Sequence, residues 1–447
     1  MSFPRYPKYK DSGVEWLGEV PDHWEVKPLY SSVAERDEPN KGMVEDNLLS
    51  LSYGRIVQKD ITSNDGLLPE SFETYQVVRP GDIVFRLTDL QNDKRSLRSA
   101  IVEETGIITS AYLTVASRGP DSKYMSYLFR AYDVTKVFYS MGGGLRQSMK
   151  FADLKRMPIL LPPPEEQTQI AAFLDRETAK IDTLVAEQRR LMELLKEKRQ
   201  AVISHAVTQG LNPHAPMKPS GIEWLGDVPA HWEVLKGSLI GTLFGSEQVP
   251  EESVADEGDL PFIKVGSLSS DSFSIKSWDW FVDRAVAARY QPRSGFIVFP
   301  KRGAAIFNNK VNIVDRPSLI DPNLMGWAIG DRAITSFIAY ALKSRKLNEL
   351  ADVSTVPQIN NKHIAPERFP IPPIDEQRGI VAHLDSELAT LDTLTAEAQR
   401  AIDLLQERRT ALISAAVTGQ IDVRPLCQLL KVGAGGTAIR SGESSAA

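Results

Sequence analysis

The sequence predicts an α/β (α+β) protein with an internal pseudo-two-fold repeat, in which two domains are separated by two long antiparallel helices. Residues 12–26 and 220–234 are identical at 12 of 15 positions. Residues 166–209 and 376–419 are identical at 24 of 44 positions. The segments between these repeated frames share almost no residue-by-residue similarity. A duplicated scaffold with two different inserts presents two different surfaces, which suits recognition of an asymmetric target in two parts.

The composition is that of an ordinary globular protein that is long enough for two or three domains. The chain has 447 residues, of which 42% are hydrophobic and 25% charged. Its single cysteine, Cys427, excludes a disulfide framework and a cysteine-based zinc site, and it fits a reducing compartment. No apolar run approaches the roughly 18 residues of a membrane span, and the first residues lack the apolar stretch of a secretion signal. We therefore expect a cytoplasmic protein with no metal site and no membrane contact.

The second repeated frame predicts two long helices. Prolines at 162–164 favour a helix start, and Gly210 and Gly419 favour the two ends. Apolar residues then recur in steps of four and three, which is the pattern of a coiled-coil seam. The predicted seam consists of Ile170, Leu174, Ile181, Leu184, Leu191, Leu195, Ile380, Leu384, Leu391, Leu394, Leu405 and Leu412.

Each helix is the obvious partner of the other, because an apolar seam of this length needs to be covered. If the helices run antiparallel with full overlap, the numbers of facing residues sum to about 584. Polar interruptions of the seam then pair by charge: Glu177 faces Arg408, and Lys198 faces Glu387. Such pairs would favour the antiparallel arrangement over the parallel one.

The two inserts predict α/β domains. Short β-like runs occur at 48–51, 76–78, 82–85 and 111–115 in the first insert, and at 262–265 and 296–299 in the second. Helical stretches follow at 122–139 and 333–350. A weak similarity between residues 79–85 and 293–299 suggests that the inserts share a fold while they differ at the surface. The expected domains are 1–161 and 211–371, the expected helices are 162–210 and 372–420, and the C-terminal segment is 421–447, with a disordered tail from 432.

Positive charge is concentrated in the inserts, although the net charge of the chain is −6. Residues 79–156 hold 13 Lys and Arg against 8 Asp and Glu, and residues 276–316 hold 8 against 3. A polyanion responds to the local field more than to the total charge. These basic stretches can also be no more than solvated surface, so charge alone leaves both interpretations open.

Two kinds of loop recur in both inserts and carry side chains suited to nucleic acid. One follows a predicted strand and the other precedes a repeated helix. Arginine can hold guanine, and glutamine or asparagine can hold adenine, through two hydrogen bonds each, while lysine suits phosphate. The candidate DNA-binding residues are Arg86, Lys94, Arg95, Arg146, Gln147 and Lys150 in the first insert, and Lys301, Arg302, Asn308, Lys310, Gln358, Asn361 and Lys362 in the second.

Catalytic motifs are missing from the sequence. It contains no phosphate-binding G-x-x-x-x-G-K-[ST] loop, no G-x-S-x-G, no H-E-x-x-H and no cysteine cluster. It also lacks the Asn/Asp-Pro-Pro-aromatic tetrapeptide expected of an adenine methyltransferase. We predict no catalytic residues. His23 and His231 occupy matched repeat positions beside Trp24 and Trp232, which suggests a packed structural corner rather than a ligand site.

Three stretches together carry a resemblance to a known family. They are Tyr9–Gly18 with Pro21 and His23-Trp24, then Pro162-Pro163, Glu166-Gln167, Ile170 and Leu174-Asp175, and last Val417–Asp422. They closely resemble the specificity subunit of type I DNA restriction–modification systems. The resemblance covers nearly the whole chain up to about Arg424, and the inserts match no residue-level pattern of the family.

The resemblance implies two target-recognition domains, each of which reads one half of a bipartite double-stranded DNA sequence. It implies no catalysis and no cofactor in this subunit. Two modification subunits would dock along the helices and methylate adenine with S-adenosylmethionine, and restriction subunits that use ATP and Mg²⁺ would join them. The alternatives are a recognition subunit of a methylation-only or other phage-defence assembly, a pure coiled-coil scaffold, and an enzyme with an unrecognised site.

Overall fold

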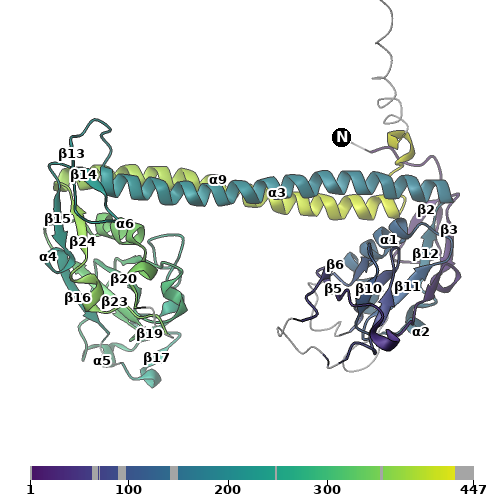
Figure 1. The fold of residues 1–447 in the computed structure, drawn as a ribbon, viewed down its shortest axis with the longest axis horizontal. Helices are drawn as coiled ribbons and strands as arrows, with labels where there is room; N and C mark the ends of the chain where they lie inside the picture. The colour runs from purple at the N-terminus through teal and green to yellow at the C-terminus, as the bar shows by residue number, and fades with distance from the viewer. Residues whose placement is uncertain are drawn as a thin grey trace, which may run out of the picture. The chain divides into compact units, whose positions relative to one another are not determined.

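The computed structural model describes residues 3–62, 69, 71–88, 97–140, 149–246, 249–352 and 356–427. The chain forms two compact units (Figure 1). Unit 1 comprises Met1–Gln188 and Arg400–Ala447, and unit 2 comprises Arg189–Gln399. The expected tail from residue 432 lies outside the described residues. The two long helices, α3 (Pro164–Gln209) and α9 (Ile374–Val417), are each continuous and contribute to both units.

Unit 1 is built on a four-stranded antiparallel sheet. Its strand order is β4 (Val33–Glu35), β11 (Leu113–Ser117), β8 (Ile83–Phe85), β9 (Ser99–Ile101). Four two-stranded pairs surround it: β1 (Tyr9–Asp11) with β2 (Glu19–Pro21), β3 (Glu25–Pro28) with β12 (Pro158–Leu161), β5 (Leu49–Ser52) with β6 (Arg55–Gln58), and β7 (Gln76–Val78) with β10 (Gly106–Ile108). Helix α1 (Ser122–Val134) and the short α2 (Phe151–Leu154) complete the unit.

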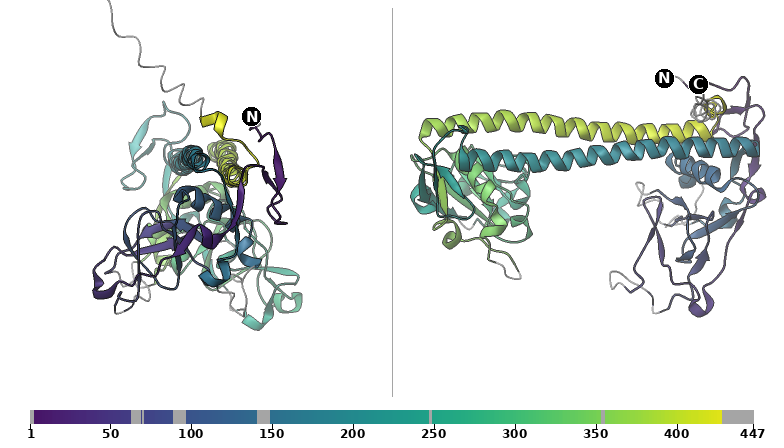
Figure 2. Two further views of the ribbon diagram at one scale, coloured as in Figure 1. Left: turned by 90° about the vertical axis from the view of Figure 1, so that its right-hand side faces the viewer. Right: turned by 45° about the horizontal axis from the view of Figure 1, so that its top comes forward.

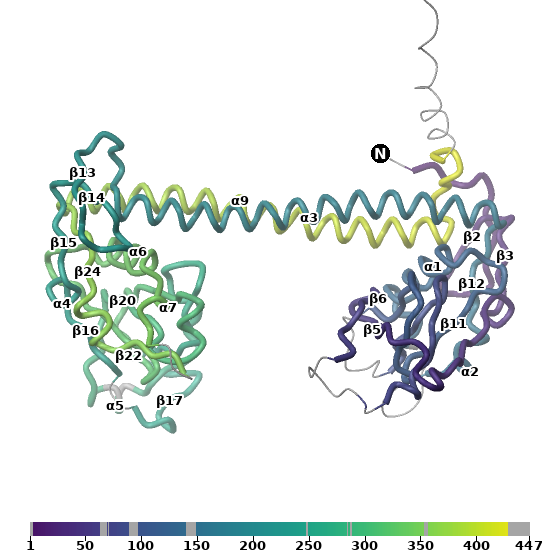
Figure 3. The backbone as a smooth tube through the Cα atoms, viewed as in Figure 1, coloured from purple at the N-terminus to yellow at the C-terminus, as the bar shows by residue number. Residues whose placement is uncertain are grey.

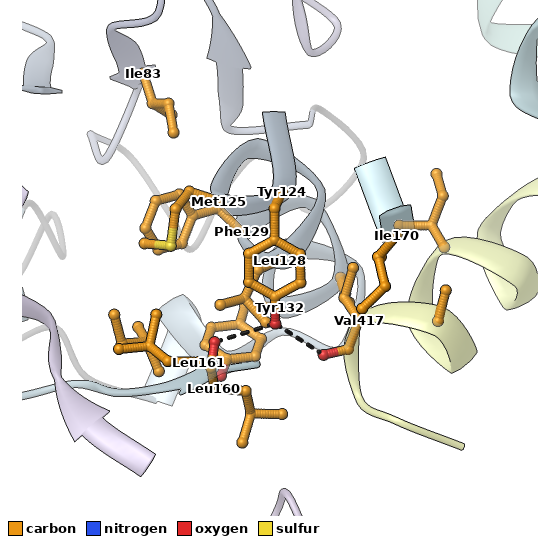
Figure 4. Packing of buried hydrophobic residues seen from close by; sticks show 14 of the residues in the cluster. Ile83, Tyr124, Met125, Leu128, Phe129, Tyr132, Leu160, Leu161, Ile170 and Val417 are labelled. Atoms are coloured by element: carbon orange, nitrogen blue, oxygen red, sulfur yellow. Dashed lines mark hydrogen bonds between the residues drawn. The ribbon is translucent and has the colours of Figure 1, made fainter. Parts of the chain in front are cut away.

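Helix α1 links the sheet of unit 1 to the long helices. The carboxylate of Asp121 caps its first turn by accepting a hydrogen bond from the Tyr124 N–H at 2.9 Å. The fully buried Tyr124 donates its hydroxyl to the carbonyl of Leu160 at 3.0 Å and reaches that of Val417 at 3.5 Å (Figure 4). One apolar core therefore joins α1, β12 and the ends of α3 and α9 that belong to this unit.

Unit 2 repeats this plan, with a related frame and a different insert. Its main sheet has the order β16 (Gly241–Gly245), β23 (Leu324–Ile329), β20 (Phe296–Pro300), β21 (Asn312–Val314). Figure 3 traces the backbone of this unit through β16 and β20. The other sheets are β13 (Met217–Pro219) with β14 (Asp227–Pro229), β15 (Glu233–Lys236) with β24 (Arg368–Ile371), and β17 (Val254–Ala255), β19 (Phe281–Val282), β18 (Leu260–Ile263), β22 (Leu319–Ile320). The helices are α4 (Gly237–Ile240), α5 (Arg284–Ala287), α6 (Thr335–Arg345), α7 (Leu347–Leu350) and α8 (Asn361–Ile364).

The predicted common fold of the inserts is confirmed. Strands β8 and β20, which contain the weak sequence similarity, occupy the same place in the two main sheets. The strand pairs β3–β12 and β15–β24 each join a repeated N-terminal frame to the segment just before a long helix. The inserts share a fold without sequence similarity because the repeated frames fix the ends of each insert, while only the burial pattern constrains the strands between them.

The helices run antiparallel in each unit and lie side by side in both views of Figure 2. Eight predicted seam residues are buried: Ile170, Leu174, Ile181, Leu195, Ile380, Leu384, Leu391 and Leu412. Leu405 is half-buried. The prediction was wrong for Leu184, Leu191 and Leu394, which are 44%, 41% and 42% exposed.

Thr178 accounts for the error at Leu184 in α3. It lies in the seam at 4% exposure, because its hydroxyl donates to the carbonyl of Leu174 at 2.7 Å. The steps from Leu174 through Thr178 to Ile181 then place Val185 in the seam instead of Leu184. The apolar pattern did not indicate Thr178, because it is polar. The seam of α3 therefore lies one residue later at this point than the pattern predicted.

The predicted helix register was also wrong, by one heptad. Glu177 pairs with Arg176 and Lys180 of its own helix and not with Arg408. The ion pairs between the helices are Asp182–Arg409, at 3.1 Å, and Arg199–Asp392. The residue numbers of the two partners sum to 591 in both pairs. The repeat with its offset of 210 residues relates Asp182 to Asp392 and Arg199 to Arg409, so the two pairs are equivalent. A shift of seven residues keeps an apolar seam on both facing sides, so the observed register rests on these ion pairs and on the packing of the helix ends in the core of each unit.

The predicted structural corner around the repeated tryptophans is confirmed. Trp24 and Trp232 are 0% and 1% exposed. His23 contacts Glu166 at 2.8 Å, and His231 contacts Glu376 at 2.7 Å. In unit 1 the carboxylate of Glu166 also accepts hydrogen bonds from the Trp24 indole, at 3.1 Å, and from the Tyr6 hydroxyl. Burial raises the pKa of Tyr6, so its phenol is a neutral donor to Glu166.

We expect Glu166→Ala to destabilise unit 1 by about 3 kcal/mol, because it leaves two buried donors without an acceptor. The matched control is Glu376→Ala in unit 2. Among the described residues the buried Trp232 indole nitrogen already has no partner, so the expected loss there is below about 1 kcal/mol. Urea denaturation followed by circular dichroism measures both losses, and equal losses would contradict the asymmetry of the two corners.

Lys343 gives unit 2 a pH-dependent stability. This residue of α6 is 7% exposed, and its ammonium donates to the carbonyl of Ser270 at 2.7 Å. Burial, and then the charge of Arg199, lowers its pKa from 10.5 to about 8. Between these two values the unfolded chain binds more protons than the folded chain, so the free energy of unfolding rises with pH. Lys343→Met should remove this rise in denaturation measured at pH 7, 8.5 and 10. An identical pH dependence in wild type and variant would contradict it.

Candidate nucleic-acid interface

Unit 2 brings the two predicted loop types together. The carbonyl of Lys301, just after β20, accepts a hydrogen bond from the Ile359 N–H at 2.9 Å. Arg302 and Gln358 form an antiparallel bridge, and the Gly303 N–H donates to the carbonyl of Pro357 at 3.0 Å. The structure therefore gathers five candidates, which we call the second loop cluster: Lys301, Arg302, Gln358, Asn361 and Lys362.

Unit 1 makes the same connection at the equivalent place. The carbonyl of Leu87, just after β8, accepts a hydrogen bond from the Met149 N–H at 3.0 Å. Arg86 and Lys150 lie on these two facing segments, and we call them the first loop cluster. Lys94, Arg95, Arg146 and Gln147 lie outside the described residues.

The backbone fixes both clusters from two sides. In unit 2 the Lys301 N–H donates to the carbonyl of Asn323 at 2.7 Å, and the Asn360 N–H donates to the His363 ring at 2.9 Å at the start of α8. In unit 1 the Lys150 N–H donates to the carboxylate of Asp153 at 2.8 Å at the start of α2. The side chains of the clusters are thus presented from backbone that is already ordered, which suits recognition.

The second loop cluster is basic and open to solvent. Arg302, Asn361 and Lys362 are exposed, and Gln358 is half-buried. Lys362 contacts Asp352 at 2.9 Å, and this hydrogen bond lowers the pKa of the Asp352 carboxyl. Both side chains are more than half exposed, so the pair is weak and a phosphate can compete for the lysine.

Two candidates lie apart from the cluster. The ammonium of Lys310 reaches the carbonyl of Val265 at 3.3 Å. Asn308 lines a cavity of unit 2 that is bounded by α3 and α9, together with Phe307 and Lys343. Residues 308–310, Asn-Asn-Lys, have the composition of a polar recognition loop. However, Asn309 has a structural role, because its side chain bonds to the Lys343 carbonyl of α6 and to the Leu347 N–H of α7.

Sequence analysis missed a pair of cation–aromatic contacts in the second insert. The Lys264 ammonium lies 3.6 Å from the centre of the Trp280 ring, and the Arg316 guanidinium lies 3.6 Å from that of Trp278. Trp280 is 36% exposed. The spacing of the two tryptophans inside a basic stretch was the available signal. Alternation of aromatic and basic side chains is typical of nucleic-acid surfaces.

The residues that the structure describes contain no cluster of metal ligands and no membrane-spanning helix. No three or more His, Cys, Asp or Glu side chains of these residues are placed to hold a metal ion. Within the same residues, no helix combines the length and the apolar character needed to cross a membrane.

Gln358 and Lys362 should differ in their effect on binding if the second loop cluster contacts DNA. Gln358→Ala should relax one base position of one half-site and cost about 1–3 kcal/mol there. Lys362→Ala should weaken binding to all sequences and reduce the slope of log K against log salt by about one. Binding of the assembled complex to a library of target variants distinguishes the two effects, and uniform weakening by Gln358→Ala would contradict base recognition by this residue.

Comparison with known proteins gives the family. A sequence profile for the type I restriction modification DNA specificity domain matches residues 107–192 and 229–402. The chain is 21% identical over 435 residues to the putative type I restriction enzyme MjaX specificity subunit of Methanocaldococcus jannaschii, with 91% of this chain and 96% of that protein covered. It is 21% identical over 407 residues to the EcoDI specificity subunit of Escherichia coli, with 84% and 87% covered.

Solved structures show the same fold. A chain from a study titled "Structural basis underlying complex assembly and conformational transition of the type I R-M system" has a TM-score of 0.69 and 18% identity, with 89% of this chain and 98% of that chain covered. The HsdS subunit from Thermoanaerobacter tengcongensis has a TM-score of 0.51 and 18% identity, with 90% and 98% covered. The profile covers more than half of the chain, including parts of both inserts, so the chain belongs to the type I restriction–modification DNA specificity family.

Proposed function

We propose that this protein reads a bipartite, asymmetric double-stranded DNA sequence, with one half-site for each unit. One observation carries the proposal: both units join a loop after a central strand to a segment before a short helix, yet the side chains on these loops differ. Equivalent positions suit equivalent docking on a duplex. Different side chains suit two different half-sites.

The residue types of the two clusters suit two different roles, which are contacts to bases and contacts to phosphates. Arg302 and Gln358 have the planar groups that can pair with base edges through two hydrogen bonds. Lys301, Lys362 and Lys150 supply point charges for phosphate, which fix the position of the protein without reading sequence. Arg86 follows β8 in unit 1, where it can reach either kind of group.

The repeated helices support a complex with two copies of a partner. The two repeats of the second frame are identical at 24 of 44 positions, so they offer similar surfaces twice. We infer that two modification subunits dock there, and that restriction subunits join them. The partner subunits bind S-adenosylmethionine, ATP and Mg²⁺. This chain positions the partner subunits on DNA and catalyses no reaction itself. A subunit that acts on cellular DNA in this way works in the cytoplasm.

The test of this assignment separates the chain from its partners. Purified alone, the chain should neither methylate nor cleave DNA, and it should not hydrolyse ATP. Addition of the modification subunit and S-adenosylmethionine should produce adenine methylation, measured by transfer of a labelled methyl group. Methyl transfer by the isolated chain would overturn the proposal.

A further inference from the structure

The hairpin tip of unit 1 has an unusual residue in a strained position. Strands β5 and β6 pair up to Ser52 and Arg55, which leaves the two-residue turn Tyr53–Gly54. Both turn residues have positive φ, 45° and 75°. A two-residue turn of this kind strongly favours Asn-Gly, because most side chains are strained in the left-handed region. Tyr53 therefore stands where asparagine would be more favourable for folding.

Folding does not explain the tyrosine, because its side chain is 78% exposed. Gly54 beneath it is buried, and a Cβ atom there would lie 2.0 Å from the Arg130 Nη1 atom. The Arg130 guanidinium donates to the carbonyls of Gly54 and Ser99. The tip is thus held firmly from below while the phenol ring projects into solvent. A strained and exposed aromatic residue on a fixed support is typical of a binding site.

The tip is connected to the first loop cluster through the side chain of Arg130 and through Arg98. Ser99, which shares Arg130 with the tip, begins β9 and directly follows Arg98. The Arg98 guanidinium donates to the carbonyl of Thr88 at 3.0 Å, and its own carbonyl accepts from the Arg86 N–H at 2.8 Å. Arg98 and Arg130 therefore connect the turn to the segment that carries Arg86.

Positive charge gathers beneath and beside the tip. Arg55 follows the turn and is exposed. Burial lowers the pKa of Arg130 to about 10; the charge of Asp133 opposes this shift, and those of Arg409 and Arg55 add to it. Arg409 is paired with Asp182 on α3. Arg55 of β6 and Arg409 of α9 are thus both near enough to Arg130 of α1 to act on its charge, and Arg55 lies two residues after the exposed Tyr53. This combination suits a nucleic-acid backbone.

We propose that Tyr53 and Arg55 form an additional DNA contact of unit 1, which holds the sugar–phosphate backbone beside the first half-site. The inference rests on the proposed function, and it adds a contact that carries no sequence information. Arg55 supplies the charge for a phosphate, and Tyr53 supplies a ring and a hydroxyl for the adjacent sugar or phosphate.

The test uses the complex of this chain with its modification subunit and a labelled duplex that carries the sequence it methylates. Tyr53→Asn creates the preferred Asn-Gly turn, so the thermal unfolding midpoint should stay equal or rise. Its affinity for DNA should nevertheless fall about ten-fold, through loss of the hydroxyl contact to the charged backbone. Arg55→Gln should reduce the slope of log K against log salt by about one. Neither variant should change which sequences are methylated. The matched control is Tyr30→Asn, a tyrosine that is 54% exposed in the 3-10 helix η1 (Leu29–Ser31) and should bind as the wild type does.

Two results would overturn the inference and leave the proposed function intact. One is unchanged affinity and salt slope in both variants, while the wild type methylates a bipartite target. The other is weaker assembly with the modification subunit at unchanged DNA affinity of the assembled complex, which would assign the tip to protein docking. Failure of the proposed function is separate, because the wild-type complex would then show no bipartite target at all.

Discussion

Exchange of residues 27–158 for the corresponding insert of a relative changes one half of the DNA target and leaves the other half intact. We expect this complete switch because both exchange points lie on one pair of strands. Lys27 and Pro28 of β3 pair with Ile159 and Pro158 of β12, so the new insert enters and leaves through neighbouring backbone. Sequencing of methylated genomic sites measures the switch.

The reciprocal exchange is its control. Replacement of residues 236–368 joins the insert through Lys236 and Arg368, which pair in the equivalent strands β15 and β24. It should change the opposite half of the target. If either exchange altered both halves together, the two units would not read independently.

Addition of one heptad to both long helices changes the spacing between the half-sites but not their sequences. The observed register places the insertion after Gln188 in α3 and after Ile402 in α9, because these points face each other when residue numbers sum to 591. Both ion pairs between the helices then remain intact. Seven residues lengthen the pair by about 10.5 Å, which corresponds to at most about three base pairs.

The original target should be bound much more weakly by the lengthened protein. Its half-sites are then about three base pairs too close together for the lengthened helices. A target with three added base pairs restores the distance, but it rotates the second half-site by roughly 100°. A library with fixed half-sites and variable spacers, bound by the assembled complex, measures the new preference. Undiminished preference for the original spacer would show that helix length does not set it.

The sequence predicted the architecture because residues of the repeated frames form the long helices and the corners that determine it. Proline and glycine boundaries, the apolar seam and the paired tryptophans are local signals, and the structure places helices and corners where they indicate. The register failed because two alignments one heptad apart bury the same apolar faces. The contacts of Arg199 and Arg409 and the packing of the helix ends in the core of each unit separate them, and both depend on the folded chain.

The candidate site was predictable in part. The recurrence of two loop types in both inserts singled these loops out as candidates, and the hydrogen bonds from Met149 and Ile359 bring the two loops of each unit together. Lys310 and Tyr53 show why the rest was not predictable. Lys310 reaches a backbone carbonyl that only the folded chain places nearby, and Tyr53 gains its exposure from a turn that local composition does not reveal.

Sequencing of the adenines methylated by the wild-type complex tests the central claim most directly. Genomic DNA from a strain without other adenine methylation is treated with this chain and its modification subunit, and every modified position is mapped. The proposed function predicts two different specified half-sites, separated by a spacer of fixed length and unspecified sequence. A single continuous motif, or two identical half-sites, would contradict it.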